Sequence, residues 1–227
     1  MIDAAWLSAR VQALAADAPT PAWLPRLLLA SDFAFDTLRQ VPGLLADLDA
    51  RVHDTRPPAA RWQPGDNGFQ SALRRFRRGE SVRLIARDLL GLDTVADTLA
   101  GSSRLADTCI GLALDEAVKR VAARHGVIVD ADGRVQPPVV FALGKLGGDE
   151  LNFSSDVDLV FAYAGGGQDS DGAVPLAPDA WHARIVRQFA QLLGETDVDG
   201  FSHRVDLRLR PFGQSGKPSL SFPAMEQ

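Results

Sequence analysis

The stretch from Val139 to Tyr163 constrains the fold of this chain most strongly, because strand-like and turn-like segments alternate within it. Its sequence is VVFALGKLGGDELNFSSDVDLVFAY. The apolar run Val139–Leu143 has the length of a buried strand. The glycine-rich segment Gly144–Gly148 interrupts the run, and glycine lets a backbone approach a phosphate group closely. The sequence therefore predicts a strand, a glycine turn, a short helix over 149–152 and a second strand.

Acidic residues on the second predicted strand are the candidate metal ligands. Asp156 and Asp158 are two residues apart, so a strand places both side chains on one face. Two carboxylates so close repel each other, and a divalent metal ion with oxygen ligands would relieve that repulsion. Asp206 lies in another alternating segment, residues 201–210, which predicts a third carboxylate on a neighbouring strand. Three acids beside a glycine turn predict a two-metal site for phosphoryl or nucleotidyl transfer.

The bulk composition excludes several other classes of protein. The chain of 227 residues has one cysteine, Cys109, so it holds no internal disulfide and suits a reducing compartment. It shows no signal peptide and no apolar run of about 18 residues that could span a membrane, which predicts a cytoplasmic protein. The net charge is −5, and residues 139–227 hold 7 basic and 12 acidic side chains. Such an acidic segment predicts no binding to nucleic acid.

The organisation predicted from these patterns is an α+β fold in two parts. Residues 1–136 form a mainly helical region, with Ser31 as a helix N-cap and helices over 69–90, 94–100 and 103–124. Residues 137–227 form a small mixed sheet with flanking helices, including one over 179–193. The arginine cluster at residues 74–78 is interpreted as a solvated helix face, with docking to an acidic partner or to another domain as the alternative. Because the chain stops just as a last helix begins, we expect a fragment whose catalytic core is truncated.

Four motifs resemble those of a known family, the bifunctional glutamine synthetase adenylyltransferase/adenylyl-removing enzymes. They are Gly-Lys-Leu-Gly-Gly, Glu-Leu-Asn, Ser-Ser-Asp-Val-Asp-Leu and Arg-Val-Asp-Leu-Arg-Leu-Arg-Pro-Phe-Gly. The close match covers about residues 139–223, and the helical leader matches more loosely. The resemblance implies a DNA polymerase β-like nucleotidyltransferase core. In that family an N-terminal domain removes AMP from glutamine synthetase and a C-terminal domain adds it. The helical leader and the variants Glu-Leu-Asn-Phe-Ser-Ser and Arg-Pro-Phe-Gly-Gln-Ser-Gly resemble the N-terminal, adenylyl-removing half.

The resemblance also implies a reaction and a set of site residues. The reaction is phosphorolysis, in which adenylyl-tyrosine and phosphate give ADP and tyrosine, with ADP or ATP as the nucleotides bound. Asp156, Asp158 and Asp206 would be the catalytic residues and would hold one or two Mg²⁺ ions. Other residues would bind phosphate oxygens, namely Gly147, Gly148, Ser155, Lys145, Arg208 and Arg210. Glutamine synthetase and the PII signalling protein are the implied partners.

Alternatives stay open for several of these assignments. Lys145 is equally well interpreted as a solvated turn lysine, and Arg208 and Arg210 as structural partners of the acidic cluster. Asn152 is interpreted as bracing the turn rather than touching a ligand. For the chain as a whole, the alternatives are the adenylylating half of the same enzyme and a fragment that only docks glutamine synthetase or PII. A uridylyltransferase of PII and an RNA nucleotidyltransferase are less consistent with the motifs and the charge.

Overall fold

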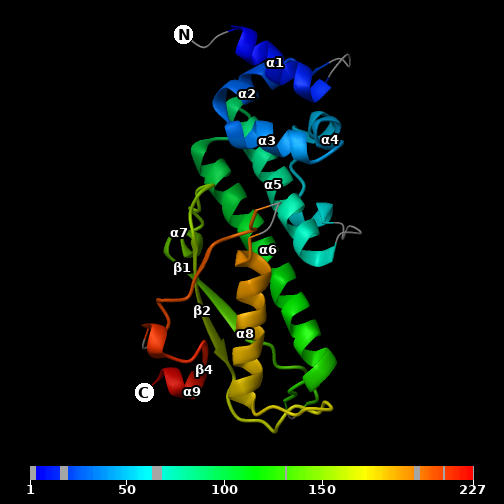
Figure 1. The fold of residues 1–227 in the computed structure, drawn as a ribbon. Coiled ribbons are helices and arrows are strands. Elements are labelled where there is room, and N and C mark those ends of the chain that lie inside the picture. Colours follow the sequence, from blue (N-terminus) through cyan, green and yellow to red (C-terminus); the bar gives the residue numbers. More distant parts are fainter. Residues whose placement is uncertain are drawn as a thin grey trace. The chain divides into compact units, whose positions relative to one another are not determined.

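The computed structural model describes residues 4–15, 20–62, 68–130, 132–196, 200–211 and 213–226 (Figure 1). The chain divides into two compact units, Met1–Leu105 and Ala106–Gln227. Helices make up the N-terminal part, and a small mixed sheet with helices follows, so the predicted α+β class is confirmed. The predicted boundary between residues 136 and 137 concerns the start of the catalytic core, and it stays a prediction.

The first unit is built from helices. They are α1 (Ala4–Ala15), α2 (Leu24–Ala30), α3 (Asp32–Gln40), α4 (Leu44–Arg51) and α5 (Gly68–Leu89), with a 3₁₀ turn at Pro58–Arg61. The predicted N-cap is confirmed, because the Ser31 side chain accepts a hydrogen bond of 3.1 Å from the Ala34 N–H. Gly91 follows α5 with φ at +69°, the left-handed conformation that glycine favours just beyond a helix.

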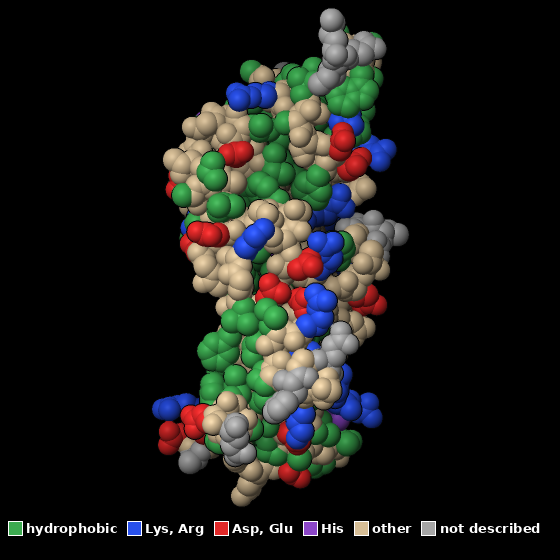
Figure 2. Space-filling view, turned by 90° about the vertical axis from the view of Figure 1, so that its left-hand side faces the viewer, with side chains coloured by type: hydrophobic (Ala, Val, Ile, Leu, Met, Phe, Trp, Pro, Cys, Tyr) green, Lys and Arg blue, Asp and Glu red, His purple; other side chains and the backbone are tan. Residues whose placement is uncertain are grey.

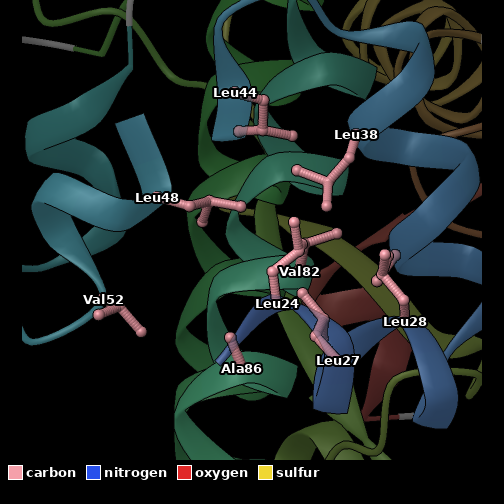
Figure 3. Packing of buried hydrophobic residues seen from close by; sticks show 10 residues of the cluster. Leu24, Leu27, Leu28, Leu38, Leu44, Leu48, Val52, Val82 and Ala86 are labelled. Carbon is pink, nitrogen blue, oxygen red and sulfur yellow. The ribbon is translucent and has the colours of Figure 1, made fainter. Parts of the chain in front are cut away.

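A leucine-rich core holds these helices together (Figure 3). Its fully buried members come from α2, α3, α4 and α5, and Figure 3 shows their side chains pointing toward one another. They include Leu24, Leu27, Leu28, Leu48 and Val82, each no more than 1% exposed. Burying a leucine side chain is worth about 1.5–3 kcal/mol, so this cluster is the main source of the unit's stability.

Helix α6 (Val95–His125) is one continuous helix of 31 residues, where the sequence predicted two. The expected break at residues 101 and 102 does not occur. Gly101 instead lets Leu84 of α5 approach, since a Cβ there would lie 2.8 Å from the Leu84 Cδ2. The Ser103 hydroxyl donates to the Leu99 carbonyl at 3.0 Å, which satisfies it inside the helix.

The second unit is organised around β2 (Val157–Tyr163), the central strand of a four-stranded mixed sheet. Strand β1 (Val139–Leu143) pairs with it antiparallel. Strands β3 (Val205–Asp206) and β4 (Ser219–Ser221) both pair with it parallel. The predicted strand over 201–210 is thus shortened to two residues. The strand ends early because the Asp206 side chain accepts a hydrogen bond of 2.8 Å from the Arg208 N–H, which turns the chain.

One face of this sheet is covered by α8 (Pro178–Gly194), which lies along the strands in Figure 1. Phe161 of β2 packs edge-on against Phe189 with ring centroids 5.1 Å apart, and Tyr163 stacks on His182. The opposite face is more open. There, Phe141 is 42% exposed, so β1 is a half-exposed edge strand and the predicted burial is wrong. On the molecular face drawn in Figure 2, hydrophobic side chains lie in the upper as well as the lower half, among charged and other side chains.

Short elements complete the unit. Helix α7 (Gly144–Gly147) follows β1 directly, so the short helix lies on the glycine segment and not over 149–152 as predicted. Asp149 instead adopts a left-handed φ of +58° in the turn after α7. Helix α9 (Phe222–Met225) follows β4, and Gly213–Ser215 forms a 3₁₀ turn. None of the described helices is both long and apolar enough to cross a membrane.

Candidate active site

The carboxylates predicted to act together lie at the start of the central strand. Asp158 of β2 and Asp206 of β3 are direct partners in the parallel register. Directly paired residues on adjacent strands place their side chains on the same face. Because Phe161 and Tyr163 contact α8, Asp158 faces the opposite, more open side of the sheet. Asp156 lies one residue before β2 begins.

The glycine segment lies directly beside Asp158. A Cβ on Gly144, which has φ at +57°, would lie 2.8 Å from the Asp158 Oδ2 atom. A Cβ on Gly147 would lie 2.5 Å from the Ala142 carbonyl oxygen. Missing side chains at these two positions therefore let α7 fold back against β1 and the carboxylate. The Gly148 N–H donates to the Gly144 carbonyl at 3.2 Å, so it is used inside the turn, and its part in phosphate binding stays a prediction.

The turn before β2 is braced by a small polar chain. The Ser155 hydroxyl donates to the Asn152 Oδ1 at 2.6 Å, and the Lys145 ammonium donates to the Ser155 oxygen at 3.4 Å. Asn152 thus makes the bracing contact expected of it. Lys145 is exposed and next to Ser155, so the two polar groups predicted to meet a phosphate lie together.

Arginines hold two of the three carboxylates. Arg208 binds Asp206 through its Nε at 2.8 Å and its Nη2 at 2.5 Å. These hydrogen bonds, with that from the Arg208 N–H, lower the pKa of Asp206. In turn, Asp206 raises the pKa of Arg208, and the charges of Asp158 and Asp156 raise it further, so all three acids lie within electrostatic reach of this guanidinium.

The other predicted phosphate ligand, Arg210, is directed toward its own turn. It donates to the Leu207 carbonyl at 2.8 Å and to the Gly216 carbonyl at 3.3 Å. Its place in this structure supports the turn after β3. Its predicted contact with phosphate stays a prediction.

Arg204 belongs to the site and was missed by the sequence analysis. Its Nε donates to Asp156 Oδ1 at 2.5 Å, and its Nη2 donates to the Ser154 carbonyl at 3.2 Å. The signal that could have found it is alternation, since Arg204 is two residues before Asp206 and shares its strand face.

The residues fit a divalent metal in donor chemistry and in backbone placement. Carboxylate oxygens are what Mg²⁺ prefers, and the missing Gly144 side chain leaves room beside Asp158. The side chains are not arranged as a metal cage, however. Among the described residues no group of three or more His, Cys, Asp or Glu could hold a metal ion. Asp156 and Asp206 are turned toward arginines instead.

A separate cavity lies at the far end of β2. It has a volume of about 630 Å³, and its lining includes Ile128, Tyr163, Gly165 and His182. Tyr163 is five residues from Asp158, which corresponds to about 17 Å along a strand. None of the predicted site residues lines this cavity.

Comparison with known proteins agrees with the motifs. The family model of the glutamate-ammonia ligase adenylyltransferases (GlnE) matches residues 8–227. The bifunctional glutamine synthetase adenylyltransferase/adenylyl-removing enzyme of Xanthomonas campestris pv. campestris (strain B100) is 54% identical over an alignment of 225 residues, and the match covers 96% of this chain and 24% of that protein.

Relatives with the same name occur in other bacteria. The protein of Stenotrophomonas maltophilia (strain R551-3) is 56% identical over 206 residues, covering 90% of this chain and 22% of the relative. That of Thioalkalivibrio sulfidiphilus (strain HL-EbGR7) is 44% identical over 217 residues. The chain thus spans about a quarter of the length of the curated relatives it matches. With a family model matched over nearly its whole length, the chain belongs to the glutamate-ammonia ligase adenylyltransferase family of nucleotidyltransferases.

Proposed function

We propose that this chain carries the site that removes AMP from adenylylated glutamine synthetase by phosphorolysis. The observation that supports this most is the pairing of Asp158 with Asp206 across two parallel strands, beside a glycine turn that leaves space at the Asp158 carboxylate. The relatives are named for adding and removing an adenylyl group on glutamine synthetase. The choice of the removing half rests on the motif variants around Asn152 and Gly213.

In the proposed reaction an oxygen of inorganic phosphate attacks the phosphorus of the adenylyl group. The bond from this phosphorus to the tyrosine oxygen breaks, and a new phosphorus–oxygen–phosphorus bond gives ADP. The tyrosine oxygen leaves with the electron pair and then takes up a proton. A phenol has a pKa of about 10, so its anion leaves more readily than an alkoxide.

Each group of side chains has a separate task in this proposal. Asp156, Asp158 and Asp206 would hold one or two Mg²⁺ ions, which supply positive charge at the reacting phosphorus when bound. Lys145 and Ser155 lie together at the mouth of the turn and would bind phosphate oxygens. Arg208 carries a fixed positive charge within reach of all three acids and would orient the attacking phosphate.

The setting of the reaction is part of the same proposal. We place the chain in the cytoplasm, where glutamine synthetase is the substrate and PII the regulatory partner. The bound nucleotides are ADP in the removing direction and ATP in the adding direction. These assignments describe the larger proteins that the relatives represent.

The experiment measures ADP released from adenylylated glutamine synthetase in the presence of Mg²⁺ and phosphate. The unsubstituted chain is compared with Asp158→Asn and with Asp169→Asn, a matched control in an exposed loop away from the site. We expect ADP from the unsubstituted chain and from Asp169→Asn, and a loss of at least about a hundredfold for Asp158→Asn.

Two other outcomes would contradict the proposal in different ways. Transfer of AMP from ATP to unmodified glutamine synthetase, without ADP release, would identify the adenylylating half. Binding of glutamine synthetase with no turnover in either direction would identify a docking module.

A further inference from the structure

Arg204 is fixed to the candidate site through both its backbone and its side chain. The Val157 N–H donates to the Arg204 carbonyl at 2.9 Å, which holds the residue beside the first position of β2. Its side chain independently reaches Asp156 at 2.5 Å and the Ser154 carbonyl at 3.2 Å. The guanidinium can therefore dissociate from Asp156 while the backbone of Arg204 stays in place beside β2.

The ion pair is too exposed to be explained by stability. The Arg204 side chain is 61% exposed and the Asp156 side chain 47%. Pairs of this kind contribute little to folding, because water and salt screen them. An arginine at this position is better explained by what its charge does next to the reacting groups.

The guanidinium occupies an oxygen that a divalent cation would need. Asp156 Oδ1 accepts the Arg204 Nε, and Asp206 is held in the same manner by Arg208. At equal distance a divalent cation attracts a carboxylate about twice as strongly as a guanidinium does. A bound cation would therefore displace Arg204 from Asp156 and leave a charged, five-donor group at the edge of the site.

We propose that Arg204 holds Asp156 in the metal-free protein and turns to the phosphate oxygens of the nucleotide when a divalent cation takes that carboxylate. The inference rests on the proposed function in assuming a divalent cation and a phosphate-bearing substrate. Guanidinium is charged at every physiological pH and matches two phosphate oxygens at once, which a lysine cannot do. Arg204 is thus a substrate-binding residue in addition to Lys145, Ser155 and Arg208.

The test measures two binding constants of the same chain, with Mn²⁺ and ADP as probes. Mn²⁺ affinity is followed by electron paramagnetic resonance of the free ion, and ADP affinity by calorimetry at saturating Mn²⁺. The variants are Arg204→Gln, Arg204→Lys and the control Arg134→Gln. Arg134 is 77% exposed and pairs with Asp132, away from all site residues.

The two constants should move in opposite directions in Arg204→Gln. Mn²⁺ should bind about two to five times more tightly, because the competing guanidinium is gone. ADP should bind at least about ten times more weakly, because a charged hydrogen-bond donor to phosphate is lost. Arg204→Lys should show both changes to a smaller extent, and Arg134→Gln neither.

A purely structural Arg204 gives a different pattern. Unchanged or weaker Mn²⁺ binding by Arg204→Gln, or unchanged ADP binding at saturating Mn²⁺, overturns the inference, as does failure of the unsubstituted chain to bind millimolar Mn²⁺. Circular dichroism checks the fold. If Arg204→Gln does not fold, Arg204→Lys is the test, and tighter Mn²⁺ binding together with weaker ADP binding is again the expected result. Both constants are measured without glutamine synthetase. If they behave as expected and no AMP is removed from the synthetase, only the proposed function fails.

Discussion

At the scale of single residues, neighbouring glycines in the site have different physical reasons to be glycine. Gly144 needs a left-handed backbone and lies against the Asp158 carboxylate. Gly147 has an ordinary helical position, but the Ala142 carbonyl oxygen fills the space of a side chain. A Cβ on Gly148 would make only ordinary van der Waals contacts, the nearest with the Gly144 carbonyl oxygen at 3.7 Å. Gly144 is therefore required by backbone conformation and Gly147 by close packing, whereas neither requires a glycine at position 148.

This difference predicts unequal effects of adding a methyl group. Gly147→Ala forces backbone atoms of β1 and α7 apart, and we expect a loss of about 1–3 kcal/mol in the free energy of unfolding. Gly148→Ala is the matched control, one residue away, and should change it by less than about 0.5 kcal/mol. Urea unfolding followed by tryptophan fluorescence measures both. Equal losses in the two variants would show that the close approach of α7 to the Ala142 carbonyl does not exist.

At the scale of elements, the end of α6 is tied to the loop before α8 by direct backbone contact. Gly126 ends α6 with φ at +73°, and a Cβ on Gly172 would lie 2.1 Å from the His125 carbonyl carbon. The Gly172 N–H donates to the His125 carbonyl at 3.0 Å, and the Trp181 Nε1 donates to the Gly126 carbonyl at 3.0 Å. The end of α6 and the loop before α8 are thus joined at a point where no side chain fits.

A substitution at this contact should be among the most damaging on the surface of the unit. Gly172→Ala leaves no room for the methyl group between two backbones, and we expect a loss of about 3 kcal/mol or more. Gly111→Ala, in the middle of α6 with nothing within 4 Å of the added carbon, should instead gain about 0.5–1 kcal/mol. Thermal unfolding of the two variants beside the parent checks both signs. A neutral Gly172→Ala would contradict the contact.

Elements with long periodic patterns were the easiest to predict from the sequence. The helix predicted over 69–90 is Gly68–Leu89, and the one over 179–193 is Pro178–Gly194. The break predicted in α6 failed because Gly101 serves a contact with Leu84, which only the tertiary fold reveals. Burial of β1 was wrong for a related reason, since an apolar run does not say whether a strand lies at the edge of its sheet.

Of the candidate site, the sequence could predict only those side-chain positions that follow from alternation along a strand. Alternation predicted Asp156 and Asp158 on one face of the second strand, with Asp206 on a neighbouring strand. In the structure Asp158 and Asp206 are register partners on β2 and β3, whereas Asp156 lies one residue before β2. The sequence did not establish that Asp156 and Asp206 bind arginines in the metal-free protein, because these contacts depend on side-chain rotamers and not on sequence spacing. Arg204 was missed although the same alternation applies to it.

At the scale of the whole molecule, the free energy of unfolding at acidic pH should depend on the ionisation of one carboxylate in the helical unit. Asp54 accepts hydrogen bonds from the Arg56 N–H and Nε, both at 2.8 Å. The backbone bond, followed by the Arg56 and Arg61 side chains, lowers the pKa of Asp54 to about 2. A carboxyl with a lowered pKa stabilises the fold when it is ionised, so its contribution is complete above about pH 4 and is lost as the pH falls toward 2.

Asp54→Asn should therefore destabilise the chain in a pH-dependent way. The variant should unfold at a lower urea concentration than the parent at pH 7 and at pH 5. The gap between the two should narrow as the pH is lowered from 4 toward 2, because the parent carboxyl then takes up a proton and loses its advantage. A gap that is constant down to pH 2 would show that the arginine contacts of Asp54 contribute nothing.

For the whole molecule, we propose that inorganic phosphate is the attacking group at the site of Asp158 and Asp206. The most direct measurement supplies radiolabelled inorganic phosphate together with unlabelled adenylylated glutamine synthetase and Mg²⁺, and then separates the nucleotides. The proposed phosphorolysis predicts label in ADP, dependent on Asp158, with one ADP formed for each adenylyl group removed. Release of unlabelled AMP, or label that enters no nucleotide while AMP is transferred from ATP, would contradict it.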